Sequence, residues 1–146
     1  MNDLPSHDPN RCRVIGVLDD GVVSLGATAL AHLRTADVVI GGARTLALLR
    51  HALKPGAVTH DLTGQLKAVP GWVRAAREAH QACVVLATGD PLCHGIAPYL
   101  AQHLCLDALE ILPNLSTLQL ACARVGLAWQ DARIAVSYTH LRAHET

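Results

Sequence analysis

The sequence predicts an α/β fold: a mostly parallel five-stranded sheet flanked by helices. Three observations lead to this prediction. Short β-branched runs alternate with longer stretches in which apolar residues recur at helical spacing. Apolar residues make up 51% of the 146 residues, largely as Ala, Leu and Val, which is typical of helices packed on a buried parallel sheet. Loops rich in glycine, proline or polar residues separate the segments, as repeated strand–helix–strand units require.

The three strands predicted in the first half of the chain are short apolar runs bounded by polar residues or glycine. The first follows a polar N-terminal stretch, the second stops at Gly41-Gly42, and the third is less apolar. The helix between the first two strands is expected to begin at Ser24, because serine is a good N-cap residue. The predicted strands are Arg13–Leu18, Asp37–Ile40 and Ala57–Leu62, and the predicted helices are Ser24–Thr35 and Ala43–Leu53.

The second half continues the alternation. Pro70-Gly71 either interrupts the first helix of this half or delays its start. The run CVVLA is typical of a buried strand, and Pro98 is tolerated only in the first turn of the helix that follows. Gly126 is expected to end the last helix. The predicted helices are Gly64–Gln81, Gly95–Leu104 and Ser116–Val125, and the predicted strands are Cys83–Ala87 and Leu109–Leu112.

Four segments are expected along the chain: a disordered tail over 1–12, a first α/β domain over 13–113, the start of a truncated second α/β domain over 114–135, and a non-native tail over 136–146. In the last segment, VSYTHLRAHET, the apolar patterning disappears, and the string resembles translated cloning-adapter sequence. His140 and His144 have the i, i+4 spacing of metal ligands, but no cysteine or acidic partner stands in a matching pattern. No metal site is predicted.

Composition and charge argue against several functions. Lys+Arg and Asp+Glu are 12 each, so there is no basic excess for nucleic-acid binding. Aromatic residues are only 3%, with no Phe, which disfavours base stacking. No apolar run approaches the ~20 residues of a membrane helix, and the N-terminus lacks the apolar core of a signal peptide. The five cysteines form no CxxC pair and are expected to be reduced in a cytoplasmic protein.

The loop after the first strand carries two adjacent acids. The carboxyl ends of parallel strands meet at one edge of a sheet, where ligands bind. Gly16–Gly21 (GVLDDG) has the outer glycines of a dinucleotide fingerprint, but Leu18 replaces the middle one. Leu18 would block the approach of a pyrophosphate, and Asp19 and Asp20 would repel it. We interpret the two acids as either solvated turn residues or part of an active-site mouth.

The loop after the fourth strand presents backbone donors and acceptors at the same edge. Its sequence is ATGDPLCHG. Gly89 permits an unusual turn, Asp90 can accept hydrogen bonds from neighbouring amides, and Pro91 fixes the next step. His94 is a candidate ligand contact because it lies in this loop. An ordinary turn is the alternative interpretation.

The loop after the fifth strand is a turn followed by a helix cap. Pro113-Asn114 makes the turn, and Ser116 or Thr117 caps the helix. No Gly-x-Ser-x-Gly nucleophile elbow and no P-loop occur in the sequence.

In this order and spacing the motifs resemble the tetrapyrrole methylase family of S-adenosylmethionine-dependent enzymes. The DDG, GGARTL and NLSTLQLACAR segments favour the subgroup that methylates a precorrin at C5, and in fused members at C15, in cobalamin biosynthesis. Another methylase of this family, acting on uroporphyrinogen III or a different precorrin, is one alternative. A non-catalytic flavodoxin-like ligand-binding module is the other. The resemblance is carried by Val14–Gly21, Asp37–Leu49, Val84–Leu100 and Leu112–Trp129.

The resemblance implies two α/β domains with S-adenosylmethionine between them, and a homodimer. Arg44 is a candidate partner for a carboxylate of the precorrin or cobalt-precorrin substrate. Asp19 and Asp20 are candidate catalytic residues, which would place the macrocycle or take up a proton. Many family members have glycine at the position of Leu18, so the first loop departs from the pattern. Because the family's second domain extends further than residue 134, the fragment alone is expected to be inactive. The implied cofactor contacts are Gly89, Asp90, Pro91, His94 and Gly95, with Ser116 and Thr117 on the other side.

Overall fold

The computed structural model describes residues 10–93 and 95–133. The chain divides into two compact units, Met1–Leu115 and Ser116–Thr146, and each is described by itself. The expected N-terminal tail up to residue 9, His94, and the expected non-native tail lie outside the described residues.

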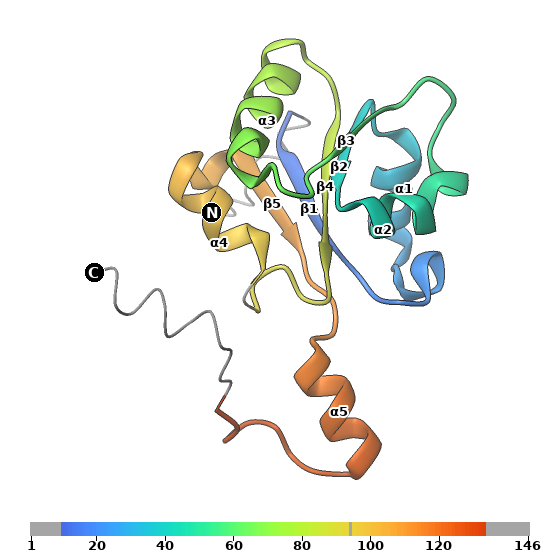
Figure 1. The fold of residues 1–146 in the computed structure, drawn as a ribbon, viewed down its shortest axis with the longest axis vertical. Helices are drawn as coiled ribbons and strands as arrows, with labels where there is room; N and C mark the ends of the chain where they lie inside the picture. Colours follow the sequence, from blue (N-terminus) through green and yellow to red (C-terminus); the bar gives the residue numbers. More distant parts are fainter. Residues whose placement is uncertain (1–9, 94, 134–146) are drawn as a thin grey trace, which may run out of the picture. The chain divides into compact units, whose positions relative to one another are not determined.

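The first unit is built on a five-stranded, all-parallel sheet with strand order β3-β2-β4-β1-β5 (Figure 1). This confirms the predicted fold class, and every predicted strand is present within one residue at each end. Strands β1 and β4 lie next to each other near the middle of the sheet and are almost entirely buried. The strands are β1 (Cys12–Val17), β2 (Val38–Gly41), β3 (Val58–Asp61), β4 (Cys83–Thr88) and β5 (Leu109–Leu112).

Helices cover both faces of this sheet. Successive strand residues point to opposite faces, so Val14 belongs to one core cluster and Ile15 to the other. Helices α1 (Ala27–Thr35) and α2 (Ala43–Leu49) pack on the face of Ile15 through buried leucines such as Leu33. Helices α3 (Val69–Glu78) and α4 (Ile96–His103) pack on the face of Val14, and Figure 1 shows the two helix pairs on opposite sides of the strands.

The prediction that Ser24 caps the first helix is wrong. A 3-10 turn, η1 (Gly21–Ser24), follows β1, and the N-cap of α1 is Gly26. The Ser24 hydroxyl instead accepts a hydrogen bond from Leu18 N–H at 3.1 Å and donates one to the Gly21 carbonyl at 2.7 Å. A serine side chain that closes its own loop in this way competes with helix capping.

The prolines and the remaining 3-10 turns set the other helix boundaries. Pro70 lies in the first turn of α3, so the Pro-Gly pair delays this helix rather than interrupting it. Pro98 is the third residue of α4, as predicted. Helix α2 is shorter than predicted because its last residues form a 3-10 turn. The remaining turns are η2 (Arg50–Ala52), η3 (Leu66–Ala68) and η4 (Leu106–Ala108).

The described part of the second unit contains one helix, α5 (Thr117–Val125). The Ser116 hydroxyl accepts a hydrogen bond from Gln119 N–H at 3.1 Å, and Gln119 Oε1 accepts one from Ser116 N–H at 2.7 Å. These reciprocal bonds form a capping box. Gly126 ends the helix in the left-handed conformation, with φ of 72°. Both predicted ends of this helix are confirmed.

Candidate functional site

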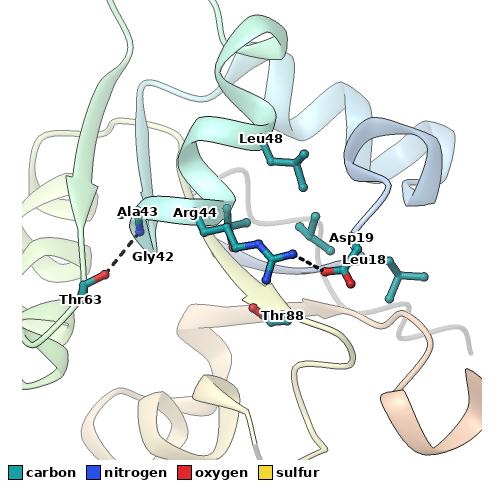
Figure 2. A pocket seen from close by; sticks show the side chains of 10 residues that line it. Leu18, Asp19, Gly42, Ala43, Arg44, Leu48, Thr63 and Thr88 are labelled. Carbon is teal, nitrogen blue, oxygen red and sulfur yellow. Dashed lines mark hydrogen bonds and ion pairs between the residues drawn. The ribbon is translucent and has the colours of Figure 1, made fainter. Parts of the chain in front are cut away.

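A cavity of about 380 Å³ opens at the carboxyl edge of the sheet in the first unit. Four neighbouring strands contribute to it, through the ends of β1 and β4 and the loops that follow β1, β2 and β3. Figure 2 shows these side chains around the opening. Its location is the ligand-binding edge expected of an open parallel sheet. The cavity is lined by Val17, Leu18, Asp19, Gly42, Ala43, Arg44, Thr45, Leu48, Thr63 and Thr88.

Two charged candidates meet in this cavity. Arg44, the second residue of α2, places Nη2 3.5 Å from Asp19 Oδ1 (Figure 2). Their side chains are 86% and 85% exposed, so the pair contributes little to stability. Both charges therefore remain accessible to a ligand. Asp20 is also exposed, but it does not line the cavity.

Thr63, which follows β3, fixes the opposite wall of the cavity. Its hydroxyl accepts a hydrogen bond from Ala43 N–H at 3.4 Å, at the start of α2 (Figure 2). Its N–H donates to Asp61 Oδ1 at 2.9 Å. Hydrogen bonds from the Thr63 side chain and main chain lower the pKa of Asp61 below its ordinary value. An ionised carboxylate therefore holds this wall in place.

The described residues of the loop after β4 form a turn that is held by a hydrogen bond to β1 and by hydrogen bonds within the loop. Gly89 has φ of 71° and donates its N–H to the Val17 carbonyl at 2.8 Å. Asp90 Oδ1 accepts a hydrogen bond from Leu92 N–H at 3.1 Å, which confirms the predicted acceptor role. Pro91 is fully buried. A Cβ on Gly95, the N-cap of α4, would lie 2.5 Å from the Pro91 carbonyl oxygen.

Gly16 and Asn114 also lie at this edge and were not among the predicted site residues. Gly16, in β1, is packed so closely that a Cβ there would lie 2.3 Å from the Gly89 carbonyl oxygen and 2.8 Å from Asn114 Cβ. Asn114 Nδ2 donates to the Gly16 carbonyl at 2.9 Å. A glycine inside a β-branched strand indicates a close backbone approach, so RVIGVL contained the signal for Gly16. Thr63 and Thr88 carried no comparable signal.

The family of tetrapyrrole (corrin/porphyrin) methylases matches residues 13–146. The chain belongs to the tetrapyrrole methylase family. Among curated relatives of this methylase, the precorrin-6Y C(5,15)-methyltransferase [decarboxylating] of Mycobacterium tuberculosis is 35% identical over 121 residues, which is 83% of this chain and 30% of the relative. The cobalt-precorrin-7 C(5)-methyltransferase of Salmonella typhimurium is 31% identical over 125 residues, which is 86% of this chain and 60% of the relative.

Solved structures have the same fold as this chain. The methyltransferase CobJ superposes with a TM-score of 0.70 at 22% identity, over 86% of this chain and 55% of that protein. Uroporphyrin-III C-methyl transferase from Thermus thermophilus, complexed with S-adenosyl homocysteine, superposes with a TM-score of 0.58 at 23% identity, over 86% of this chain and 52% of that protein. This chain spans 30% of the length of the first of these curated relatives and 60% of the length of the second.

The structure brings together only part of the predicted methylase site. Asp19 and Arg44 share the cavity, and Thr88 links its wall to the Gly89–Gly95 loop. Ser116 and Thr117 begin the second unit, so their contact with a cofactor stays a prediction. In the described residues no cluster of histidine, cysteine and acidic side chains could hold a metal ion, and no helix there is long and apolar enough to span a membrane.

Proposed function

We propose that the chain is part of an S-adenosylmethionine-dependent C-methyltransferase that methylates a precorrin at C5 in cobalamin biosynthesis, with C15 methylation in a fused form. The observation that carries this proposal is the Gly89–Gly95 loop, which continues from the cavity wall at Thr88 in a member of the tetrapyrrole methylase family. The names of the two curated relatives support a precorrin as the substrate class.

The residues of the Gly89–Gly95 loop fit S-adenosylmethionine in their chemistry. Asp90 is half-buried, and Leu92 N–H holds one of its carboxylate oxygens. The other oxygen makes no hydrogen bond to any residue that the structure describes. A fixed carboxylate attracts the positive charges of the cofactor and can accept hydrogen bonds from its ribose hydroxyls. The Thermus thermophilus methyltransferase, solved with S-adenosyl homocysteine, supports this choice of ligand.

The chain's own residues would act mainly by positioning. Bound S-adenosylmethionine supplies a methyl group on a positively charged sulfur, and holding reactants in line contributes ~7–11 kcal/mol to lowering a barrier of this kind. A cavity of about 380 Å³ is near the lower end of the ~300–1,000 Å³ usual for small-ligand sites. We therefore propose that this cavity receives only one edge of the macrocycle. Arg44 would bind a side-chain carboxylate of the macrocycle there. Asp19 would then place the ring or take up the proton that the methylated carbon releases.

Cofactor binding is tested by titrating the isotopically labelled 146-residue chain with S-adenosylhomocysteine and following its backbone amides by NMR. The expected result is a saturable shift of the Gly89 and Gly95 amides, with the β3 amides unmoved. FMN and AMP serve as matched controls, because a flavodoxin-like or nucleotide-sensing module would respond to them instead. Saturation by FMN or AMP but not by S-adenosylhomocysteine would contradict the proposal.

Methyl transfer is tested in a chimera. Residues 10–133 of this chain replace the matching region of the Salmonella typhimurium relative, and transfer of labelled methyl to cobalt-precorrin-7 is measured. We expect the chimera to methylate the substrate, and the D19N/D20N chimera to lose turnover with little change in affinity for S-adenosylhomocysteine. A folded chimera that binds S-adenosylhomocysteine without methylating the substrate would refute the assigned reaction. The 146-residue chain alone is assayed in parallel and is expected to be inactive. Light scattering of the chimera tests whether it forms the expected homodimer.

A further inference from the structure

One amide side chain is bonded to two different segments of the carboxyl edge. Asn114 Nδ2 donates to the Gly16 carbonyl at 2.9 Å and to the Ser24 carbonyl at 3.0 Å. Asn114 Oδ1 accepts a hydrogen bond from Leu115 N–H at 2.8 Å. Both amide hydrogens and the amide oxygen are therefore used. Gly16 and Ser24 precede Asn114 by 98 and 90 residues, so this is a long-range tertiary contact.

The first of these bonds extends the sheet beyond the end of a strand. Strands β1 and β5 pair up to Ile15 and Leu112, where β5 ends. The predicted turn at Pro113-Asn114 is wrong, because these residues continue without a turn to the N-cap of α5. The Asn114 side chain then satisfies the Gly16 carbonyl, which β5 no longer reaches. A buried carbonyl left without a partner would be costly. Asn114 thus holds the last part of β1 in place.

The second bond holds the loop that carries Asp19 and Asp20. The Ser24 carbonyl, which Asn114 binds, ends η1, and the Ser24 hydroxyl closes the loop onto Leu18 N–H. A shift of Ser24 would therefore move both ends of the segment between Leu18 and Ser24. Asp19 and Asp20 lie in the middle of that segment.

The candidate cofactor loop is packed against the same point. The Gly16 backbone is so close to Gly89 that a Cβ on Gly16 would lie 2.3 Å from the Gly89 carbonyl oxygen and 3.0 Å from Pro91 Cδ. Gly89 N–H also donates to the carbonyl of Val17, one residue further along β1. Any movement of Gly16 and Val17 is therefore transmitted to the start of the Gly89–Gly95 loop.

We propose that Asn114 is a positioning residue of the methylase site: its side-chain amide holds the Asp19-Asp20 loop and, through Gly16, the Gly89–Pro91 turn in one fixed arrangement. The roles of the two loops in this proposal rest on the function proposed above. The structural coupling of the loops through Asn114 does not depend on that function. Asparagine suits this position because it combines two donors on one nitrogen with an acceptor on the adjacent oxygen. Aspartate has the same shape but would turn a carboxylate toward two carbonyl oxygens.

The test compares Asn114→Asp and Asn114→Ala with the unchanged 146-residue chain by amide hydrogen exchange. Both variants should accelerate exchange at Leu18 and Gly89 by about ten-fold or more, since losing a hydrogen bond of this kind changes an opening equilibrium by that order. Exchange at Leu62, whose N–H bonds to the Gly41 carbonyl across β2 and β3, should change less than two-fold. Gln65→Glu is the matched control, because it removes an amide donor to the main-chain carbonyl of Asp61 without touching Gly16 or Ser24.

The pH dependence separates hydrogen bonding from shape. At about pH 4, near the ordinary carboxyl pKa, the carboxyl of Asn114→Asp begins to be protonated and regains one donor. In Asn114→Asp, the exchange rates of the Leu18 and Gly89 amides should therefore fall part of the way back to those of the unchanged chain at the same pH. In Asn114→Ala they should stay elevated. The variants should also bind S-adenosylhomocysteine at least about ten-fold more weakly, while Gln65→Glu should not.

Two results would overturn the positioning role. One is unchanged exchange at Leu18 and Gly89 in both variants. The other is equal acceleration at Leu62, which would indicate only a general loss of stability. Selective exchange combined with no S-adenosylhomocysteine binding by the folded chimera, which has a complete second domain, would refute the assigned cofactor while confirming that Asn114 couples the two loops.

Discussion

Replacing Gly16 by alanine tests the close packing at the carboxyl edge. The added Cβ would lie 2.3 Å from the Gly89 carbonyl oxygen, 2.8 Å from Asn114 Cβ and 3.0 Å from Pro91 Cδ. Ordinary carbon–oxygen contacts begin at ~3.3 Å, so the overlap with the carbonyl oxygen is about 1 Å. The three neighbours are backbone, a residue held by three hydrogen bonds and a buried proline ring, none of which can rotate away. Overpacking of a well-packed core costs ~1–3 kcal/mol, and we expect a loss at the upper end of that range.

The assay is urea unfolding, with the same substitution at Gly71 as the control. Gly71 lies in α3, and a Cβ there would meet nothing within 4 Å. Alanine is favoured over glycine in a helix by roughly 0.5–1 kcal/mol, so Gly71→Ala should stabilise the chain. The same glycine-to-alanine change is therefore expected to lower the free energy of unfolding at position 16 and to raise it at position 71. A Gly16→Ala variant within about 0.5 kcal/mol of the unchanged chain, the usual range for neutral surface changes, would refute the packing argument.

Three further outcomes follow from single interactions. A hydrogen bond from Lys54 and one from a main-chain N–H lower the pKa of Asp37 in the folded state. The ionised Asp37 therefore stabilises the fold at pH values above its ordinary pKa, and this stabilisation is lost as the pH falls through the folded-state pKa. Asp37→Asn should therefore flatten the acid side of a plot of melting temperature against pH. Ser116→Ala removes the capping-box hydroxyl and should cost α5 ~1 kcal/mol, measured as faster amide exchange in its first turn. A hydrogen bond with the Cys83 thiol, together with burial, raises the pKa of the Cys12 thiol. A disulfide reagent should therefore label Cys12 only on unfolding, whereas it should label the exposed Cys105 rapidly.

The strands were predictable because their signal is local. CVVLA is apolar over its whole length and RVIGVL is apolar after Arg13, as is typical of buried strands of a parallel sheet, and both runs form the centre of the sheet. The cap of α5, predicted at Ser116 or Thr117 and found at Ser116, was predictable for the same reason, since its partner Gln119 lies within three residues. Local signals therefore located the elements and several of their ends.

Contacts between distant residues were not predictable in this way. Ser24 has the composition of a helix cap, but its hydroxyl closes the preceding loop. Asn114 was expected only to form a turn, because its two acceptors lie about 90 residues earlier in the chain. The meeting of Asp19 and Arg44 likewise depends on which strands are neighbours. Strand order is a tertiary property that no local pattern contains.

The strand order explains why two distinct loops converge on one edge. The chain leaves β1 through α1 and reaches β2 on one side of the central pair, whereas it leaves β4 through α4 and reaches β5 on the other side. The connections after two adjacent parallel strands thus diverge to opposite faces, which is the arrangement that opens a ligand crevice in an α/β sheet. At that point the Asp19 loop and the cavity lie toward α2, and the Gly89–Gly95 loop leads to α4. Gly16 and Asn114 hold the two loops together where the topology separates them, so packing at Gly16 should control both.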